Sequence, residues 1–92
     1  MYFVSGVSED DIRCVGYYSD LKDAFEVIVN NYGDINEAGC YPHAVIENIR
    51  EGLYQYDIDP IWFEFDEKTE KYKRINNRPS YIGKHFAGFA IG

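Results

Sequence analysis

Residues 40–43, Cys-Tyr-Pro-His, place a thiol and an imidazole three positions apart. A cysteine and a histidine at this spacing in a loop can form a nucleophile and its base. With Cys14 and His85, the same two side chains would supply a Cys2His2 set for zinc. The spacing typical of zinc sites, Cys-x2-Cys with His-x3–5-His, does not occur. A nucleophilic pair would also need a third orienting group, for which the chain offers no strong candidate. The sequence therefore predicts no catalytic residue, no metal and no cofactor.

Two pairs of alternate acids could also support chemistry. Asp57 and Asp59 precede Pro60, but a calcium loop needs several more oxygen ligands and a glycine at a defined position. Glu64 and Asp66 are spaced like a catalytic carboxylate pair. Strand spacing, however, puts both on one face, where they can pair with lysines of a neighbouring strand. The first pair therefore indicates an acidic turn, and the second indicates a structural role.

The segment IWFEFDEKTEKYKRI, residues 61–75, mixes aromatic and basic side chains. Such a mixture occurs in nucleic-acid stacking platforms and also in ordinary β-hairpins. With Phe65 opposite Tyr72 in an antiparallel pair, residues 67–70 form a four-residue loop, a common hairpin length. The other pairs in this register are Asp66 with Lys71, Glu64 with Lys73, Phe63 with Arg74 and Trp62 with Ile75. Lys71, Lys73 and Arg74 then each face an acid or a ring, so the sequence predicts this hairpin rather than a stacking platform.

Residues 20–32 have the pattern of an amphipathic helix. Ser19 precedes them as a candidate N-cap. Gly33 follows them and can adopt the left-handed conformation that ends many helices. The apolar residues fall on one broad face at helical spacing: Leu21, Ala24, Phe25, Ile28, Val29 and Tyr32. We expect this face to pack on a sheet.

The remaining apolar segments alternate or are rich in β-branched and aromatic residues, which is typical of strands. With the hairpin they give the order β-β-α-β-β-β-β in one α+β domain, residues 1–92, with an antiparallel sheet of five or six strands. The predicted strands outside the hairpin are residues 2–7, 12–18, 44–49 and 84–91. One helix cannot cover such a sheet. The uncovered face must be polar, be curled over, or make contacts.

Three strings carry a resemblance: AVIENIREGLY at 44–54, the hairpin string at 61–75, and HFAGFAIG at 85–92. Together they resemble the pattern of a group of small uncharacterised bacterial proteins. No activity, cofactor or catalytic residue is assigned to that group. The resemblance therefore implies a single bacterial domain and nothing about its chemistry.

The chain is acidic, with sixteen acids, nine bases and a net charge of −7. Nucleic-acid affinity depends mainly on cation contacts with phosphate, so this balance argues against a nucleic-acid partner. The N-terminus has neither the basic region nor the long apolar region of a signal peptide. No apolar run approaches the ~20 residues of a spanning helix. We expect a cytoplasmic protein with no membrane partner and with free thiols.

Aromatic residues make up 17% of the chain, and such residues are enriched in protein interfaces. The leading hypothesis is a small non-enzymatic binding or adaptor domain that acts through protein–protein contacts, self-association into a homodimer included. Trp62 anchors the contact if the helix covers the Phe65 face, and it is core if the helix covers its own face. The alternative is a small enzyme or ligand-binding protein with a pocket rimmed by loops 34–42 and 50–60. The polar groups of that rim would be Tyr41, His43, Tyr54 and Tyr56.

Overall fold

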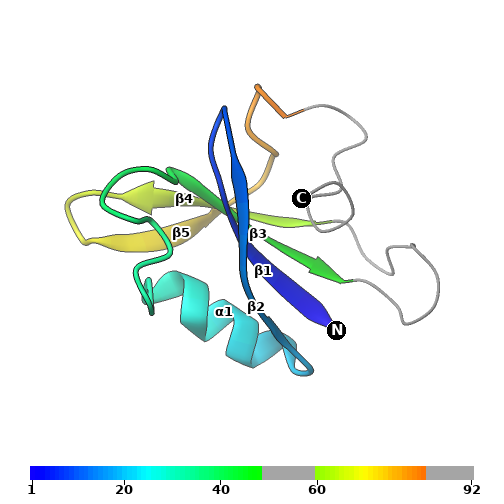
Figure 1. Ribbon diagram of the computed structural model, residues 1–92. Coiled ribbons are helices and arrows are strands. Elements are labelled where there is room, and N and C mark those ends of the chain that lie inside the picture. The colour runs from blue at the N-terminus through cyan, green and yellow to red at the C-terminus, as the bar shows by residue number, and fades with distance from the viewer. Residues whose placement is uncertain (49–59, 83–92) are drawn as a thin grey trace.

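The structure is a computed structural model, and it describes residues 1–48 and 60–82. These residues form one antiparallel sheet of five strands with a single helix against it, an α+β architecture (Figure 1). The elements are β1 (Tyr2–Val7), β2 (Ile12–Tyr18), α1 (Leu21–Val29), β3 (His43–Asn48), β4 (Ile61–Asp66) and β5 (Lys71–Ile75). The predicted fold class and the predicted order of these six elements are confirmed. The strand predicted at 84–91 lies outside the described residues.

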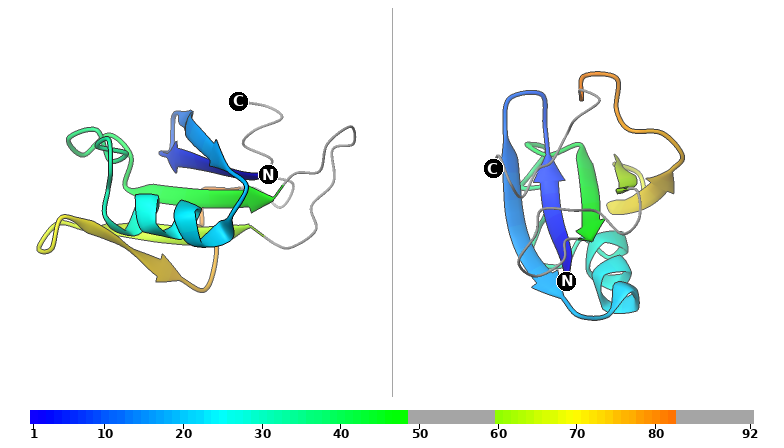
Figure 2. Two further views of the ribbon diagram at one scale, coloured as in Figure 1. Left: turned by 90° about the horizontal axis from the view of Figure 1, so that it is seen from below. Right: turned by 90° about the vertical axis from the view of Figure 1, so that its right-hand side faces the viewer.

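The strands lie in the order β2-β1-β3-β4-β5. Two hairpins, β1–β2 and β4–β5, flank β3, which pairs antiparallel with β1 on one side and with β4 on the other. The helix follows β2 and crosses one face of the sheet before the chain enters β3 (Figure 2). Within the described sheet, β2 and β5 are therefore the two edge strands.

The register predicted for the second hairpin is confirmed. Phe65 lies opposite Tyr72, and the four other predicted pairs follow in step. The rings of Phe65 and Tyr72 pack edge to face, with their centroids 5.1 Å apart. This is a favourable geometry for two aromatic rings.

The helix is shorter at both ends than the sequence predicted. Its N-cap is Asp20 rather than Ser19, because the Asp20 side chain accepts a hydrogen bond from the backbone N–H of Lys22. Its last helical residue is Val29. Asn31, not Gly33, is the first residue in the left-handed conformation, with φ of 51°. Asparagine tolerates this conformation well enough to end a helix.

The end of α1 has the hydrogen bonds of a Schellman motif. The N–H of Tyr32 donates to the carbonyl of Val27, and the N–H of Asn31 donates to the carbonyl of Ile28. These two bonds satisfy carbonyls that the helix itself leaves unpaired. The kind of helix end was therefore predicted correctly, and its position was wrong by two residues.

The main core lies between α1 and the sheet. As predicted, Leu21, Phe25 and Ile28 pack there. The ring of Phe25 meets that of Phe63 edge to face at 5.3 Å between centroids. The buried residues of this cluster come from α1, the loop after it and four strands: Val4, Ala24, Ile28, Ile35, Ala44, Ile46, Ile61, Phe63 and Tyr72.

A second, smaller core lies on the opposite face of the sheet. Val7, Val45 and Trp62 are buried there, and Ile82, which follows β5, packs against them. The helix covers the Phe65 face, the case in which the sequence predicts Trp62 on an open side. Trp62 is nevertheless only 6% exposed. The segment after β5 thus covers this part of the sheet face that lacks the helix.

Candidate functional site

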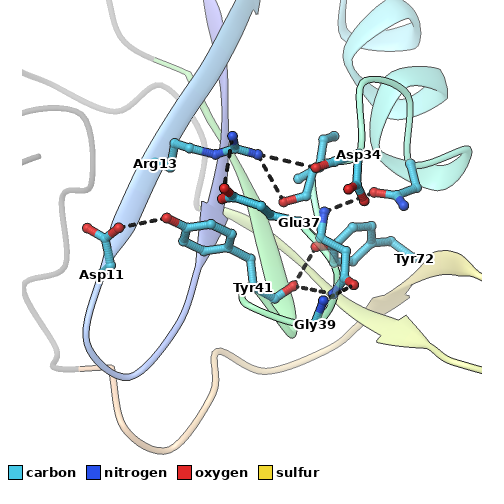
Figure 3. A network of polar contacts seen from close by, with 10 residues as sticks. Asp11, Arg13, Asp34, Glu37, Gly39, Tyr41 and Tyr72 are labelled. Atoms are coloured by element: carbon cyan, nitrogen blue, oxygen red, sulfur yellow. Dashed lines mark hydrogen bonds and ion pairs between the residues drawn. The ribbon is translucent and has the colours of Figure 1, made fainter.

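Tyr41 is the centre of a polar network that fastens the loop after α1 to the sheet (Figure 3). Its hydroxyl donates to Asp11 Oδ2 at 2.6 Å. Its backbone carbonyl accepts from the Tyr72 hydroxyl at 2.6 Å and from Asn36 Nδ2 at 2.9 Å. The residue is only 6% exposed. The sequence predicts Tyr41 on the rim of a pocket, whereas the structure buries its side chain and uses these polar atoms in hydrogen bonds within the domain.

The electrostatics of Tyr41 follow from the same contacts. Its hydrogen bond to the Asp11 carboxylate is the main cause that raises the pKa of Tyr41, and burial adds to it. Burial likewise raises the pKa of Tyr72. Both phenols are therefore held in the neutral form, in which they donate hydrogen bonds. These shifts run opposite to those that would activate a phenol as a base.

Arg13 of β2 is turned toward the same loop. Its guanidinium donates to the backbone carbonyls of Asp34 and Ile35 at 3.3 and 3.4 Å. It also forms an ion pair with Glu37 at 3.6 Å and lies over the ring of Tyr41, 5.3 Å from the centroid. Arg13 is the only charged residue of β2. Its charge is therefore directed away from the outer edge of that strand.

The loop holds an unusual backbone conformation. Asn36 is buried and organises it: its N–H donates to Asn31 Oδ1 at 3.0 Å, and its Oδ1 accepts from the N–H of Gly39 at 2.8 Å. Positive φ occurs at Asn31, Gly33, Asp34, Glu37, Ala38 and Gly39. Side chains of L-residues disfavour this region, so these contacts must hold the loop in place.

A shallow depression of about 630 Å3 lies beside this loop. Its walls are the end of α1, the loop itself and the β4–β5 turn. One rim is thus the predicted loop 34–42. Of the other predicted rim, loop 50–60, only Pro60 is among the described residues.

His43, at the start of β3, contacts Tyr81 from the segment after β5. The two side chains share a hydrogen bond of 2.7 Å between His43 Nδ1 and the Tyr81 hydroxyl, and their rings meet edge to face. Nε2 of His43 lies 3.8 Å from Glu64 Oε2. Burial lowers the pKa of His43, while Glu64 acts in the opposite direction. The net lowering of the His43 pKa favours the neutral imidazole.

The surface around His43 has a shallow depression of about 460 Å3. His43, Glu64, Arg78 and Tyr81 line it, and Cys40 does not. Cys40 and Cys14 are both exposed free thiols. The thiol of Cys40 and the imidazole of His43, which the sequence placed three positions apart, therefore do not meet in this depression. Two other predicted site residues, Tyr54 and Tyr56, lie outside the described residues.

The outer edge of β2 is a further surface, and no motif in the sequence indicates it. Tyr17 is 63% exposed, Val15 is 38% exposed, and Cys14 is exposed beside them. The ring of Tyr17 packs at an angle against Phe3 of β1, with centroids 5.9 Å apart. Val15 is the extra residue of a β-bulge, because Gly16 pairs with Val4 and Cys14 pairs with Ser5. In the described sheet, no strand lies beyond β2.

The opposite edge has a different character. Three of the five residues of β5 are cations, Lys71, Lys73 and Arg74, and all three are exposed. Charged side chains, lysine above all, protect a sheet edge from pairing with another strand. From Cys14 to Ser19, by contrast, β2 and the residue after it carry no charge at all. Strand order decides which strands are edges, and the sequence pattern does not predict that order.

Comparison of the chain with protein-family models, with curated proteins and with solved structures finds no match. None of the helices in residues 1–48 and 60–82 has the length and apolar character needed to cross a membrane. In the same part of the chain, no three histidine, cysteine or acidic side chains are grouped as a metal site would require.

Proposed function

We propose that this domain is a non-enzymatic binding module that acts through protein–protein contacts, and that it binds its partner by strand addition at the outer edge of β2. The observation that carries this proposal is the difference between the two sheet edges. An edge strand offers a row of backbone donors and acceptors to an extended segment of another chain. β5 carries three exposed cations along such a row, whereas β2 carries exposed Val15 and Tyr17.

The state of the polar side chains supports contact rather than catalysis. Tyr41 and Arg13, which are central to the loop network, make their side-chain hydrogen bonds within the domain. Raised pKa values at Tyr41 and Tyr81 keep both phenols protonated. Tyrosine, by contrast, suits an interface, since it offers a large ring and a hydrogen-bonding hydroxyl with few rotatable bonds. Tyr17 is the most exposed of the large apolar or aromatic side chains in the described residues.

We also propose that the protein works in the bacterial cytoplasm. Its two free and exposed thiols, Cys14 and Cys40, suit a reducing compartment. The net charge of −7 gives solubility and favours basic partners over nucleic acid.

Partner capture with edge variants tests the proposed function. The wild-type domain and its Val15→Lys and Tyr17→Lys variants are immobilised, and proteins captured from a bacterial lysate are quantified by mass spectrometry. We expect a set of proteins that the wild type captures and both variants lose, because a lysine on the edge opposes strand pairing. Tyr32→Lys is the matched control, since it replaces an exposed tyrosine at the end of α1 with the same charge. Equal capture by all four proteins would refute the proposal.

A second candidate function is binding of a small ligand in the depression beside loop 34–42. Its volume of about 630 Å3 is within the range of about 300–1,000 Å3 seen for ligand sites. Asn30, Asn31 and Asn36 are among the polar residues that line it. Backbone amide shifts confined to 30–42 and 67–70 during titration with a library of polar fragments would support this function.

A further inference from the structure

We propose that the partner of the β2 edge is an extended segment with an apolar or aromatic middle and basic residues at its ends. This inference rests on the proposed function and adds the chemistry of the partner. It follows from how charge is distributed along β2 and the turns at its two ends.

The middle of the edge is uncharged and exposed. Cys14, Val15 and Tyr17 are all exposed there, and no charged residue occurs between Arg13 and Asp20. In strand addition, alternate side chains of the added strand lie beside those of the edge strand. Apolar and aromatic side chains in the middle of the partner would therefore cover Val15 and Tyr17.

The two ends of the edge are acidic. Glu9, Asp10 and Asp11 form the turn before β2, and all three are exposed. Asp20 and Asp23 follow β2, and only Lys22 offsets them. The cation within the strand, Arg13, is directed to loop 34–37. A partner strand with basic ends thus finds opposite charge at both ends of its site, and most strongly beside residues 9–11.

The same charges argue against a second copy of this chain as the occupant. Two copies of β2 paired antiparallel about Val15 would bring Asp10 of each close to Asp20 of the other. Like charges placed opposite each other destabilise a strand pair. Each copy also carries a net charge of −7, which opposes association.

Synthetic peptides test this partner chemistry. The probe is a short peptide of alternating valine and tyrosine with two lysines at each end, and its counterpart has two glutamates at each end instead. Binding to the full chain is measured by fluorescence anisotropy, and its location by backbone amide shifts in NMR. We expect the lysine-flanked peptide to shift the amides of residues 12–18. We expect it to bind at least about tenfold more tightly than its counterpart, with a difference that shrinks as salt is raised.

Charge-reversal variants provide the matched control. Glu9→Lys with Asp10→Lys should weaken the lysine-flanked peptide about tenfold. Glu67→Lys with Glu70→Lys changes the net charge by the same amount at the exposed β4–β5 turn, and it should leave the affinity within about twofold. Asp11 is left unchanged because it accepts the hydrogen bond of Tyr41.

The outcomes separate this inference from the proposed function. If both peptides bind equally and shift residues 12–18, strand addition stands and the basic partner is refuted. A dimer in sedimentation that Tyr17→Lys abolishes would replace the basic partner with a second copy. A photo-reactive residue at position 17 that cross-links to a part of the same chain other than its neighbouring strand β1 would show the edge to be occupied internally, and both proposals would fall.

Discussion

The hydroxyl of Tyr72 donates a 2.6 Å hydrogen bond to the backbone carbonyl of Tyr41, 31 positions earlier in the chain. This bond joins β5, at one edge of the sheet, to the loop that follows α1. The same carbonyl accepts a second hydrogen bond from Asn36. Because Tyr72 is almost completely buried, its hydroxyl has no water to replace a lost partner.

Tyr72→Phe should lower the free energy of unfolding by about 1–3 kcal/mol, because it leaves a buried carbonyl with one hydrogen bond fewer. Urea denaturation at pH 7 measures the change. Tyr17→Phe removes the same hydroxyl from an exposed ring and should change stability by less than about 0.5 kcal/mol. Equal effects in the two variants would contradict the role given to this hydrogen bond.

The raised pKa of Tyr72 also predicts a loss of stability in alkali. Burial raises the pKa of Tyr72 in the folded protein, so above about pH 10 the unfolded chain loses a proton that the folded protein keeps. The contribution of Tyr72 to the free energy of unfolding should therefore be constant below about pH 10 and fall as pH rises further. Urea midpoints between pH 8 and 11 should decline less steeply in Tyr72→Phe than in the wild type.

His43 predicts the opposite trend in acid. Its pKa is lowered by burial, so below about pH 6.5 the unfolded chain binds a proton more readily than the folded protein. The contribution of His43 to stability is thus present above that pH and lost as pH falls through the lowered value. His43→Gln should lose less stability than the wild type between pH 7 and 5, as measured by urea denaturation at each pH. An identical decline in both proteins would refute this assignment.

Trp62→Ala should destabilise the domain by about 3–5 kcal/mol, because Trp62 is buried with Val7 and Val45 in the second core. Thermal unfolding followed by circular dichroism measures the effect. Tyr17→Ala, a truncation of an exposed ring on the same face, should cost far less. A Trp62→Ala protein with an unchanged melting temperature would instead support Trp62 as a contact residue that the fold does not need.

Phe25→Ala tests the helix–sheet contact. The ring of Phe25 meets that of Phe63 edge to face, and the guanidinium of Arg74 lies over the Phe25 ring, 5.9 Å from the ring centroid. Phe25 is only partly buried, so we expect a loss of about 2–3 kcal/mol, below the usual value for a fully buried phenylalanine. Urea denaturation measures the loss. Glu26→Ala, on the exposed side of the same helical turn, is the control and should stay within about 0.5 kcal/mol of the wild type.

Local chemistry explains why parts of the fold were predictable. In the second hairpin, a single register matches acids with lysines and rings with rings, and Phe65 opposite Tyr72 fixes it. At the ends of α1 the local rules allowed two answers. Ser19 and Asp20 are both good N-caps, and Asn31 and Gly33 both tolerate positive φ. In the structure, Asp20 caps the start of the helix and Asn31 is the first left-handed residue at its end.

The candidate site was less predictable because it depends on contacts between distant segments. The cover over Trp62 includes Ile82, twenty positions later, and nothing near Trp62 in the sequence indicates it. The loop position of Tyr41 predicts a rim residue, and its contacts with Asp11 and Tyr72, which are distant in the sequence, account for its burial. The edge at β2 exists because β1, not β2, pairs with β3, and antiparallel patterning alone does not distinguish these arrangements.

The bulge at Val15 should oppose aggregation through the edge of β2. One residue more in β2 than in β1 breaks the strict alternation of faces, so Cys14 and Tyr17 share a face although they are three positions apart. A flat strand with perfect alternation would be a template for indiscriminate stacking, as in amyloid. Because a bulge bends its strand, a strand added to this edge would have to match an interrupted pattern on either side of Val15. Deletion of Val15 would straighten the edge and exchange this selectivity for a tendency to form fibrils.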